Sequence, residues 1–403
     1  MSIKVSDFLR VTSILTMLGL ILTSIGCNKD DNPQSSIDDQ PSNSENSSYN
    51  YSIPEEKQDG WSIASVEDVA IDKILLEEAI SKIVDGNFVK ISSVLVSRDG
   101  KLIVDELFRT TLDNNDAAVR NTNLNIHTMQ SATKSFTSAL MGIAIDKGYI
   151  NSIETGFYTL FPEYGSFENW SDSKNDITLE NVLTMQHGWQ YNEWDYPIES
   201  DQNTLFFIYR NYSDFVKGLL DLPMSSEPGN TFVYSTMASH ALGAAISSKS
   251  SKSIPDFAQE YLFGPMQFGT TYWLFSPANR AMTGCCLFIS GRDMTKLGQL
   301  YLDEGRWNGK QLISSDWIEK SITSAVHLDL GFTDGYGYQW WMKEFKVNGQ
   351  SMDSFFAAGN GGQFIYVFPS LNAVISFTGE NYGSQTMYQV TSLLEDYLLK
   401  AFK

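Results

Sequence analysis

The segment from Ser131 to Gly148, SATKSFTSALMGIAIDKG, constrains the fold of this chain most strongly. Its pattern predicts an α-helix that ends at Gly148, and between Ala139 and Ile145 this helix is apolar on nearly all sides. Such a helix is stable only when other elements cover it all round. The sequence therefore predicts a globular domain with this helix at its centre.

Strand-rich segments lie near both ends of the folded part of the chain. Each pair of segments is joined by a short run of turn-forming residues, which predicts two β-hairpins. The predicted hairpins are 89–97 with 101–108, joined by 98–100, and 363–368 with 373–378, joined by 369–372. This order favours a sheet closed by the two termini, with a helical insertion between the hairpins.

Two further helices are expected at the ends of the domain. Residues 71–84 form an amphipathic pattern closed by Gly86, and residues 384–402 form a second one. The apolar face of the second consists of Met387, Val390, Leu394 and Leu398.

The first 26 residues are typical of a targeting segment. Lys4 and Arg10 precede an uncharged, mostly apolar run over 11–25, which is short for a membrane span and typical of a signal-peptide core. Gly26 and Cys27 end this run, and the pattern resembles a bacterial lipoprotein signal. We expect residues 1–26 to be removed and Cys27 to be lipidated, which would anchor the protein to the outer membrane of the cell envelope. An ordinary signal peptide and an uncleaved anchor are the alternatives.

Residues 27–60 are rich in Ser, Asn, Asp, Gln and Pro and contain little that can be buried, so we expect a disordered tether. The run 28–31, Asn-Lys-Asp-Asp, resembles the surface-export signal of lipoproteins from the Bacteroidota, although a plain polar tether fits as well. The periplasmic and the surface-exposed location therefore both stay open. Residues 61–403 are expected to form one composite domain.

The composition excludes several classes of protein. With 28 Lys and Arg against 48 Asp and Glu, the net charge is −20, which repels phosphate backbones and argues against a nucleic-acid partner. Three cysteines are too few for a disulfide scaffold or a four-cysteine zinc site. Cys285 and Cys286 are expected to be reduced and buried, because a bond between adjacent cysteines is strained.

The strongest chemical signal is an S-x-x-K motif, Ser131 to Lys134, at the start of the central helix. The two side chains lie three residues apart on one helix face, within reach of each other. Free N–H groups at a helix N-terminus favour a developing anion. A buried lysine can lose enough basicity to act as the base for a serine. A second match, Ser171 to Lys174, lies in the polar run SDSKND and is interpreted as an accidental surface match.

Two later elements add possible catalytic groups. Tyr234 directly precedes an apolar helix predicted over 237–246, where its hydroxyl could carry a proton; a core tyrosine is the alternative. The small-residue turn 357–363, AAGNGGQ, leads into a strand and allows backbone N–H groups to approach a substrate carbonyl. A tight turn without a role is the alternative there.

In chain order these elements resemble the penicillin-recognising serine hydrolases of the β-lactamase and penicillin-binding protein superfamily, in the branch of class C β-lactamases and their esterase relatives. The resemblance runs from about Leu102 to the C-terminus and includes LTMQHGW at 183–189, RDMTKLGQLYLDEGRW at 292–307 and YGYQWW at 336–341. It implies an α+β fold, in which an antiparallel sheet flanked by helices lies beside an all-helical subdomain, with the active site between them.

Carried over residue by residue, the resemblance implies Ser131 as the acylated nucleophile, Lys134 as its base and Tyr234 as a second proton carrier. The backbone N–H groups of Ser131 and Asn360 would form the oxyanion hole. The expected substrate pocket includes Thr236, Ala357, Gly359, Trp189 and Trp340. The substrate would be a small ester or amide, and we expect a monomer without a cofactor.

Two departures from the family pattern bear on the substrate. Peptidases and β-lactamases usually begin the third motif with Lys or His, as in K-T-G or H-x-G, where this chain has Ala357, and Thr236 replaces the Asn of Y-x-N. A lysine helps to hold a substrate carboxylate, which alanine cannot do. The A-x-G-x-G-G-Q form looks instead like esterases and 6-aminohexanoate-dimer hydrolases of the same superfamily. A true β-lactamase or D-Ala-D-Ala carboxypeptidase, and an inactive binding or sensory lipoprotein, are the alternatives.

Other patterns carry less weight. The sequence has no G-x-S-x-G, which a lipase-type α/β-hydrolase needs. Its histidines lack H-E-x-x-H spacing, so no metal site is expected, and His187 is expected to be structural or at the pocket edge. Two aromatic clusters flank the predicted site and could stack on a substrate or belong to the core: Trp189, Tyr191, Trp194 and Tyr196, and Trp340 and Trp341.

Overall fold

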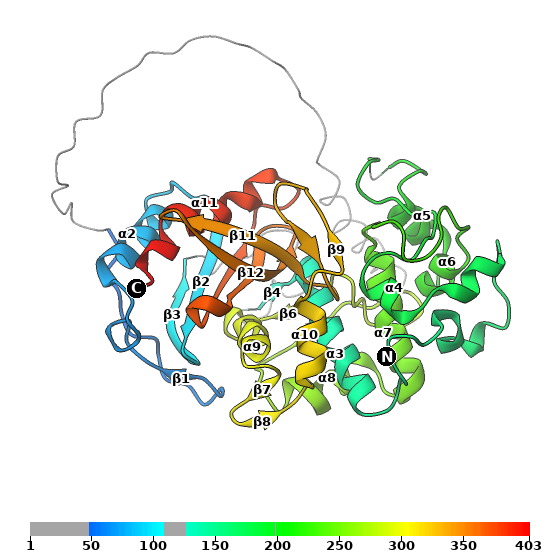
Figure 1. Cartoon of the computed structure of the whole chain (residues 1–403), viewed down its shortest axis with the longest axis horizontal. Coiled ribbons are helices and arrows are strands. Elements are labelled where there is room, and N and C mark those ends of the chain that lie inside the picture. Colours follow the sequence, from blue (N-terminus) through cyan, green and yellow to red (C-terminus); the bar gives the residue numbers. More distant parts are fainter. Residues whose placement is uncertain (1–47, 109–125, 198) are drawn as a thin grey trace, which may run out of the picture.

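The computed structural model describes residues 48–108, 126–197 and 199–403, whose arrangement Figure 1 shows. A large sheet with flanking helices forms one part of the molecule, and a mainly helical region lies beside it. The predicted signal peptide, Cys27 and residues 27–47 of the predicted tether lie outside the described residues. None of the helices formed by the described residues has the length and apolar character needed to span a bilayer.

The large sheet has nine strands and is antiparallel, except that β1 runs parallel to β3 at one edge. In spatial order the strands are β1 (Ser62–Ile63), β3 (Lys101–Leu107), β2 (Ile91–Arg98), β14 (Ala373–Gly379), β13 (Gln363–Phe368), β12 (Gln350–Gly359), β11 (Trp341–Val347), β10 (Gly335–Tyr336) and β9 (Val326–His327). Because β2 pairs with β14, the two ends of the domain meet at the centre of the sheet. The predicted α+β fold with an antiparallel sheet is confirmed.

The two predicted hairpins are present, with strand ends shifted by at most two residues. Asp99 and Gly100, which join β2 to β3, have φ values of 52° and 72°. A two-residue hairpin loop of type I′ needs positive φ at both positions, which explains why Asp-Gly specifies this turn. Asn372, with φ of 49°, likewise ends the turn between β13 and β14.

Helices cover both faces of the sheet. Counting those of the helical region as well, the α-helices of the described residues are α2 (Lys73–Val84), α3 (Thr133–Asp146), α4 (Leu179–Leu183), α5 (Thr204–Asn211), α6 (Phe215–Leu220), α7 (Thr236–Ser250), α8 (Ile254–Ala258), α9 (Gly291–Leu302), α10 (Ser315–Ile322) and α11 (Gln389–Asp396). Gly298 of α9 lies directly over Ile365 and Val374, where a larger residue would collide. Tyr366 points to the other face, because side chains alternate along a strand, and there it interacts with Thr391 of α11.

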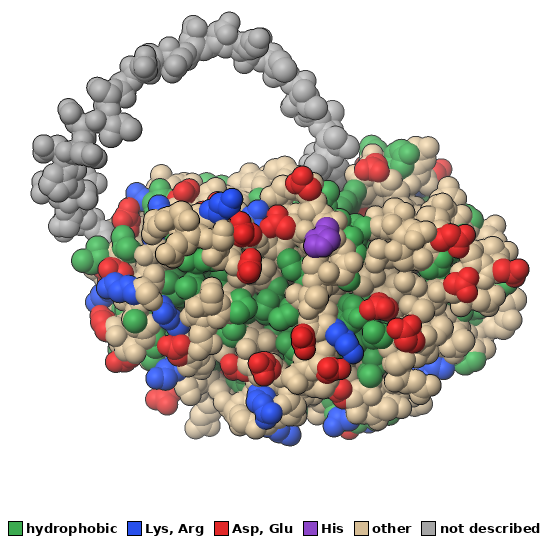
Figure 2. Space-filling model, viewed as in Figure 1, with side chains coloured by type: hydrophobic (Ala, Val, Ile, Leu, Met, Phe, Trp, Pro, Cys, Tyr) green, Lys and Arg blue, Asp and Glu red, His purple; other side chains and the backbone are tan. Residues whose placement is uncertain are grey.

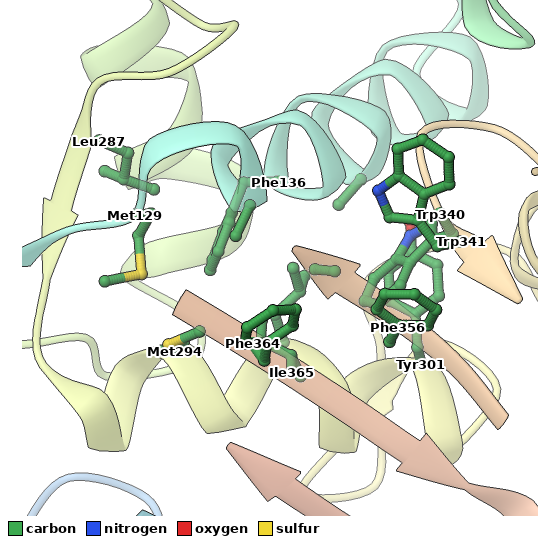
Figure 3. Packing of buried hydrophobic residues seen from close by; sticks show 14 of the residues in the cluster. Met129, Phe136, Leu287, Met294, Tyr301, Trp340, Trp341, Phe356, Phe364 and Ile365 are labelled. Carbon is green, nitrogen blue, oxygen red and sulfur yellow. The ribbon is translucent and has the colours of Figure 1, made fainter. Parts of the chain in front are cut away.

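The predicted central helix is α3, in which every residue from Thr133 to Ala144 is buried. Figure 3 shows Met129 and Phe136 beside the start of this helix, with Met294 and Tyr301 of α9 across the same core. The helix begins two residues later than predicted, because Ser131 lies in the preceding 3₁₀ turn, η4 (Gln130–Ala132). This difference matters, since the turn sets the direction of the Ser131 side chain.

The C-terminal segment is not one continuous helix as predicted. It consists of η10 (Gln385–Tyr388), α11 and η11 (Leu398–Ala401), with a break at Tyr397, where φ is −134° and ψ is −71°. The break allows the Ala401 carbonyl to accept a hydrogen bond of 2.8 Å from Asp72 N at the start of α2. The four residues predicted to share its apolar face are nevertheless all buried.

Residues 48–60, the described part of the predicted tether, follow the surface of the domain. Tyr49 N donates to Ser81 Oγ at 3.1 Å, and Tyr51 N donates to Glu77 Oε1 at 2.9 Å. Asp59 pairs with Arg292 Nε at 2.6 Å. The sequence did not show this packing, because the partners lie in α2 and α9, far along the chain.

Candidate active site

Ser131 lies where a short strand turns into the central helix. β4 (His127–Thr128) pairs with β6 (Leu287–Ile289), which in turn pairs with β5 (Tyr272–Trp273). Gln130, the residue before Ser131, has φ of 47°, a left-handed conformation that is costly for any residue but glycine. Ser131 remains partly exposed while Gln130 and Ala132 are buried. The turn therefore presents one hydroxyl at the edge of an otherwise buried helix.

The structure brings Lys134 against Ser131, as the motif predicts. Lys134 Nζ lies 3.1 Å from Ser131 Oγ, 3.1 Å from Thr236 Oγ1 and 2.7 Å from the Gly284 carbonyl oxygen. Only 2% of Lys134 is exposed. Its amine is therefore held by three oxygens and shielded from water.

Burial lowers the pKa of Lys134 to about 8, although the nearby Glu193 carboxylate opposes this shift. About half of the Lys134 amines would then be neutral at pH 8. A neutral amine has a lone pair that can accept the proton of a hydroxyl. Lys134 is therefore suited to act as a base near neutral pH.

Tyr234 lies directly before α7, whose first turn is capped by Ser235 Oγ, an acceptor from Ala238 N at 3.0 Å. Lys134 Nζ lies 4.8 Å from the centre of the Tyr234 ring. Burial raises the pKa of the Tyr234 hydroxyl, and a hydrogen bond with Ser131 lowers it in part. The hydroxyl therefore stays protonated beside Ser131, where it can donate a proton to a leaving group.

The end of β12 lies against the Ser131 turn. A Cβ atom at Gly359 would come within 2.2 Å of the Met129 carbonyl oxygen and 3.1 Å of Ala132 N, so only glycine fits there. The next residue, Asn360, is held by its side chain, because Asn360 Oδ1 accepts a hydrogen bond from Gly383 N at 2.8 Å. This places the predicted oxyanion-hole segments, around Ser131 and Asn360, side by side.

Glu193 is a member of this cluster that the sequence analysis missed. Its carboxylate accepts hydrogen bonds from Thr236 N at 2.8 Å, from Thr236 Oγ1 at 2.9 Å and from the Tyr191 hydroxyl at 2.6 Å. Burial raises the pKa of Glu193, and the charge of Lys134 and these hydrogen bonds oppose that shift. Its position within the aromatic run directly after LTMQHGW was the one signal that pointed to it.

Three residues predicted to line the pocket do not reach its surface. Trp189 and Trp340 have no exposed area, because Trp189 stacks on His187 and Trp340 packs against Tyr301, as Figure 3 shows for the latter pair. Ala357 is also fully buried, on the sheet face that packs against α9. The side chains at these three positions are part of the core, so their prediction as substrate contacts is wrong.

Two other aromatic residues of the predicted clusters do flank the site. Trp194 stacks on Tyr234 with ring centres 4.7 Å apart, and Trp341 stacks with ring centres 5.6 Å from Tyr234. Half of Trp194 is exposed, whereas Trp341 is buried. Trp194 therefore forms a wall that a substrate could contact, and Trp341 supports the tyrosine ring from inside.

His187 has a structural position. Its Nε2 lies 3.1 Å from the Val233 carbonyl oxygen, and its Nδ1 accepts a hydrogen bond from Trp189 N at 3.2 Å. Burial lowers the pKa of His187 to about 3, so the ring is neutral. It thereby fixes the chain just before Tyr234. Among residues 48–108, 126–197 and 199–403, no group of three or more His, Cys, Asp or Glu side chains is placed to hold a metal ion.

Cys285 and Cys286 form a disulfide bond and are not the reduced thiols that the sequence predicts. The Met282 carbonyl accepts hydrogen bonds from both Cys285 N and Cys286 N, at 3.4 Å and 3.1 Å. This tight turn brings the two adjacent side chains together, which could not be predicted from their adjacency in the sequence. Cys286 is buried and Cys285 is partly exposed.

The second S-x-x-K match was predicted to lie on the surface, but its lysine is buried. Lys174, within η7 (Asp172–Asp176), is fully buried and donates to the carbonyl oxygens of Glu168 at 3.1 Å and Leu220 at 2.9 Å. Ser171 Oγ instead lies 3.0 Å from Ser173 Oγ. The buried amine thus supplies a donor to two backbone carbonyl groups, and Ser171 takes no part in these hydrogen bonds.

Comparison with known proteins identifies the family of this chain. The profile of the family described as Beta-lactamase matches residues 79–384, and the chain therefore belongs to that family. No curated protein sequence matches the chain.

Solved structures share the fold at low sequence identity. A protein assigned as a 6-aminohexanoate-dimer hydrolase from Bacillus anthracis is 20% identical, with a TM-score of 0.63, over 86% of this chain and 90% of the other. A family VIII carboxylesterase is 15% identical, with a TM-score of 0.58, over 79% and 95%. A protein assigned as a β-lactamase from Bacteroides dorei is 14% identical, with a TM-score of 0.58, over 80% and 98%.

Proposed function

We propose that this protein is a serine hydrolase that cleaves an ester or amide bond through an acyl-enzyme on Ser131. The observation that carries the proposal is the 3.1 Å contact between Ser131 Oγ and the buried amine of Lys134. A partly exposed serine beside a lysine of lowered pKa is the arrangement that nucleophilic catalysis needs.

We infer the following steps from this arrangement. Neutral Lys134 takes the proton of Ser131 as Oγ attacks the carbonyl carbon of the substrate. The resulting oxyanion accepts hydrogen bonds from the backbone N–H groups of Ser131 and Asn360. Tyr234 gives a proton to the leaving oxygen or nitrogen. Water then attacks the acyl group and releases Ser131 by the same transfers in reverse.

A simple ester or amide is a better fit than a β-lactam. At the strand position where β-lactamases and peptidases carry a cation, this chain has the buried Ala357. The fold neighbours described as a 6-aminohexanoate-dimer hydrolase and a family VIII carboxylesterase support the same direction. On the face drawn in Figure 2, acidic and basic side chains are interspersed.

The test compares turnover of a short-chain 4-nitrophenyl ester with that of a chromogenic cephalosporin, by the wild type and by Ser131→Ala. We expect ester turnover that is lost in Ser131→Ala and little cephalosporin turnover. Efficient, serine-dependent hydrolysis of the cephalosporin would instead make the protein a β-lactamase. An absence of any serine-dependent turnover would favour an inactive binding lipoprotein.

We also propose that Cys27 carries lipid and anchors the mature protein to the outer membrane. The apolar run 11–25 followed by Gly26 and Cys27 supports this location. Metabolic labelling with a palmitate analogue should modify the wild type and leave Cys27→Ser unlabelled. Equal labelling of both proteins would show that Cys27 is not the lipidated residue.

A further inference from the structure

Glu193 holds Thr236 through two hydrogen bonds at once. One carboxylate oxygen, Oε2, accepts from Thr236 N at 2.8 Å and also from the Tyr191 hydroxyl at 2.6 Å. The other, Oε1, accepts from Thr236 Oγ1 at 2.9 Å. Because a hydroxyl has a single proton, Thr236 Oγ1 has no proton left for any other partner.

This bond decides what Lys134 can do with its other neighbours. The Gly284 carbonyl can only accept a hydrogen bond from Lys134. The Thr236 hydroxyl already donates its proton to Glu193, so toward Lys134 it too can only accept. A neutral amine has two N–H groups and one lone pair. Once both N–H groups point to these acceptors, the lone pair points to the third neighbour, Ser131 Oγ.

We propose that Glu193 is a positioning residue that, through the Thr236 hydroxyl, aims the lone pair of Lys134 at Ser131. The inference rests on the proposed function, because it explains how Lys134 accepts the proton of the nucleophile. Glu193 itself touches neither Ser131 nor the reacting bond in this account.

Glutamine at position 193 would reverse the chain of hydrogen bonds. Two donors, Thr236 N and the Tyr191 hydroxyl, meet at the Oε2 position, so the amide oxygen of glutamine must stand there. Its NH₂ group would then face Thr236 Oγ1 and donate to it. The Thr236 proton would turn toward Lys134 and occupy the lone pair, leaving Ser131 without a base.

The charge of Glu193 gives a second, independent readout. Among residues 48–108, 126–197 and 199–403, the ionisable groups that interact with Glu193, besides the Lys134 ammonium, are phenols: Tyr191, Tyr209 of α5, Tyr234 and Tyr336 of β10. Glu193 raises the pKa of Lys134 by attraction. Removing its charge should therefore lower that pKa, and the acid limb of kcat/KM, which reports the free base, should move to lower pH.

The experiment measures kcat/KM for ester hydrolysis from pH 5 to pH 10 in the wild type, Glu193→Gln, Thr236→Val and the double variant. We expect Glu193→Gln to lose about 100-fold at the plateau, a typical general-base contribution, with its acid limb at lower pH. In the Thr236→Val background the same change should cost far less, because the two residues act in series. Thr236→Ser, which keeps the hydroxyl, should recover most of the rate lost in Thr236→Val.

Several results would overturn the proposal. A Glu193→Gln plateau within about threefold of the wild type, with an unmoved acid limb, would remove the positioning role. If Glu193→Gln does not fold, full activity of Thr236→Val would refute the relay by itself. Losses that simply add in the double variant would mean that the residues act separately. These failures leave Ser131-dependent turnover by the wild type intact, whereas loss of that turnover would overturn the proposed function and this inference together.

Discussion

The chain contains two S-x-x-K matches whose lysines have closely similar surroundings. Lys134 and Lys174 are both buried, and burial lowers the pKa of each to about 8. Each amine donates to a backbone carbonyl, and each lies over a tyrosine ring, Tyr234 at 4.8 Å and Tyr158 at 5.6 Å. By burial and basicity alone, either lysine could serve as a base.

The two sites differ in where the serine points. Ser131 Oγ lies against Lys134, whereas Ser171 Oγ lies against Ser173 while Lys174 binds the Glu168 and Leu220 carbonyls. A low lysine pKa therefore does not define an active site. What distinguishes Ser131 is the 3₁₀ turn that leads directly into α3 and brings its hydroxyl against Lys134, together with Gly359 at the end of β12 beside it.

The largest effect should separate the two lysines in catalysis. We expect Lys134→Ala to lose about 10³-fold in kcat/KM for ester hydrolysis, because the base is removed. Lys174→Ala should keep the wild-type rate per folded molecule, since its amine donates to the Glu168 and Leu220 carbonyls, while Ser171 Oγ lies against Ser173 Oγ. Circular dichroism of both variants provides the control for folding. If both variants fold and lose kcat/KM equally, Lys134 is not distinguished from Lys174 as the catalytic base.

A smaller effect should separate the two tyrosines. Tyr234→Phe removes a hydroxyl beside Ser131 and should lower kcat by about 100-fold. Tyr158→Phe removes a hydroxyl that donates to the Leu220 carbonyl at 2.8 Å and accepts from Trp189 Nε1 at 3.1 Å. Because it leaves a buried N–H without a partner, it should cost about 2 kcal/mol of unfolding free energy and leave kcat unchanged. Initial rates and urea unfolding of both variants test this pair. A fully active Tyr234→Phe would show that another group protonates the leaving atom.

The smallest effect should show the property that the two lysines share. Each has a pKa of about 8 in the folded protein and about 10.4 when unfolded. Between these values the unfolded chain holds more protons, so the unfolding free energy rises with pH, by at most about 1.4 kcal/mol per pH unit for each lysine. Lys134→Met and Lys174→Met should each flatten this rise between pH 8 and 9.5 in urea titrations. Variant curves parallel to the wild type would mean that the buried amines keep an ordinary pKa.

Local patterns in the sequence predicted the parts of the fold that neighbouring residues determine. Asp99 and Gly100 specify a tight hairpin by themselves, and Ser131 and Lys134 meet because they stand one helical turn apart. The central helix was likewise visible from its composition.

Contacts between distant segments could not be predicted in this way. Glu193 meets Thr236 across 43 residues, and Lys174 meets Leu220 across 46, so neither partner is visible in the local pattern. Trp189 and Trp340 look like pocket residues in sequence, because the same side chain suits a core and a binding surface. The break at Tyr397 and the packing of Asp59 on Arg292 also depend on the assembled fold.

Of the two S-x-x-K serines, we expect Ser131 to be activated as a nucleophile and Ser171 not to be. The most direct measurement treats the folded wild type with a fluorophosphonate at pH 8 and maps the adduct by peptide mass spectrometry. We expect one adduct per chain, on Ser131, with Ser171 unmodified, and no adduct on Ser131→Ala. An adduct on Ser171, or a folded wild type that carries none at all, would contradict this expectation.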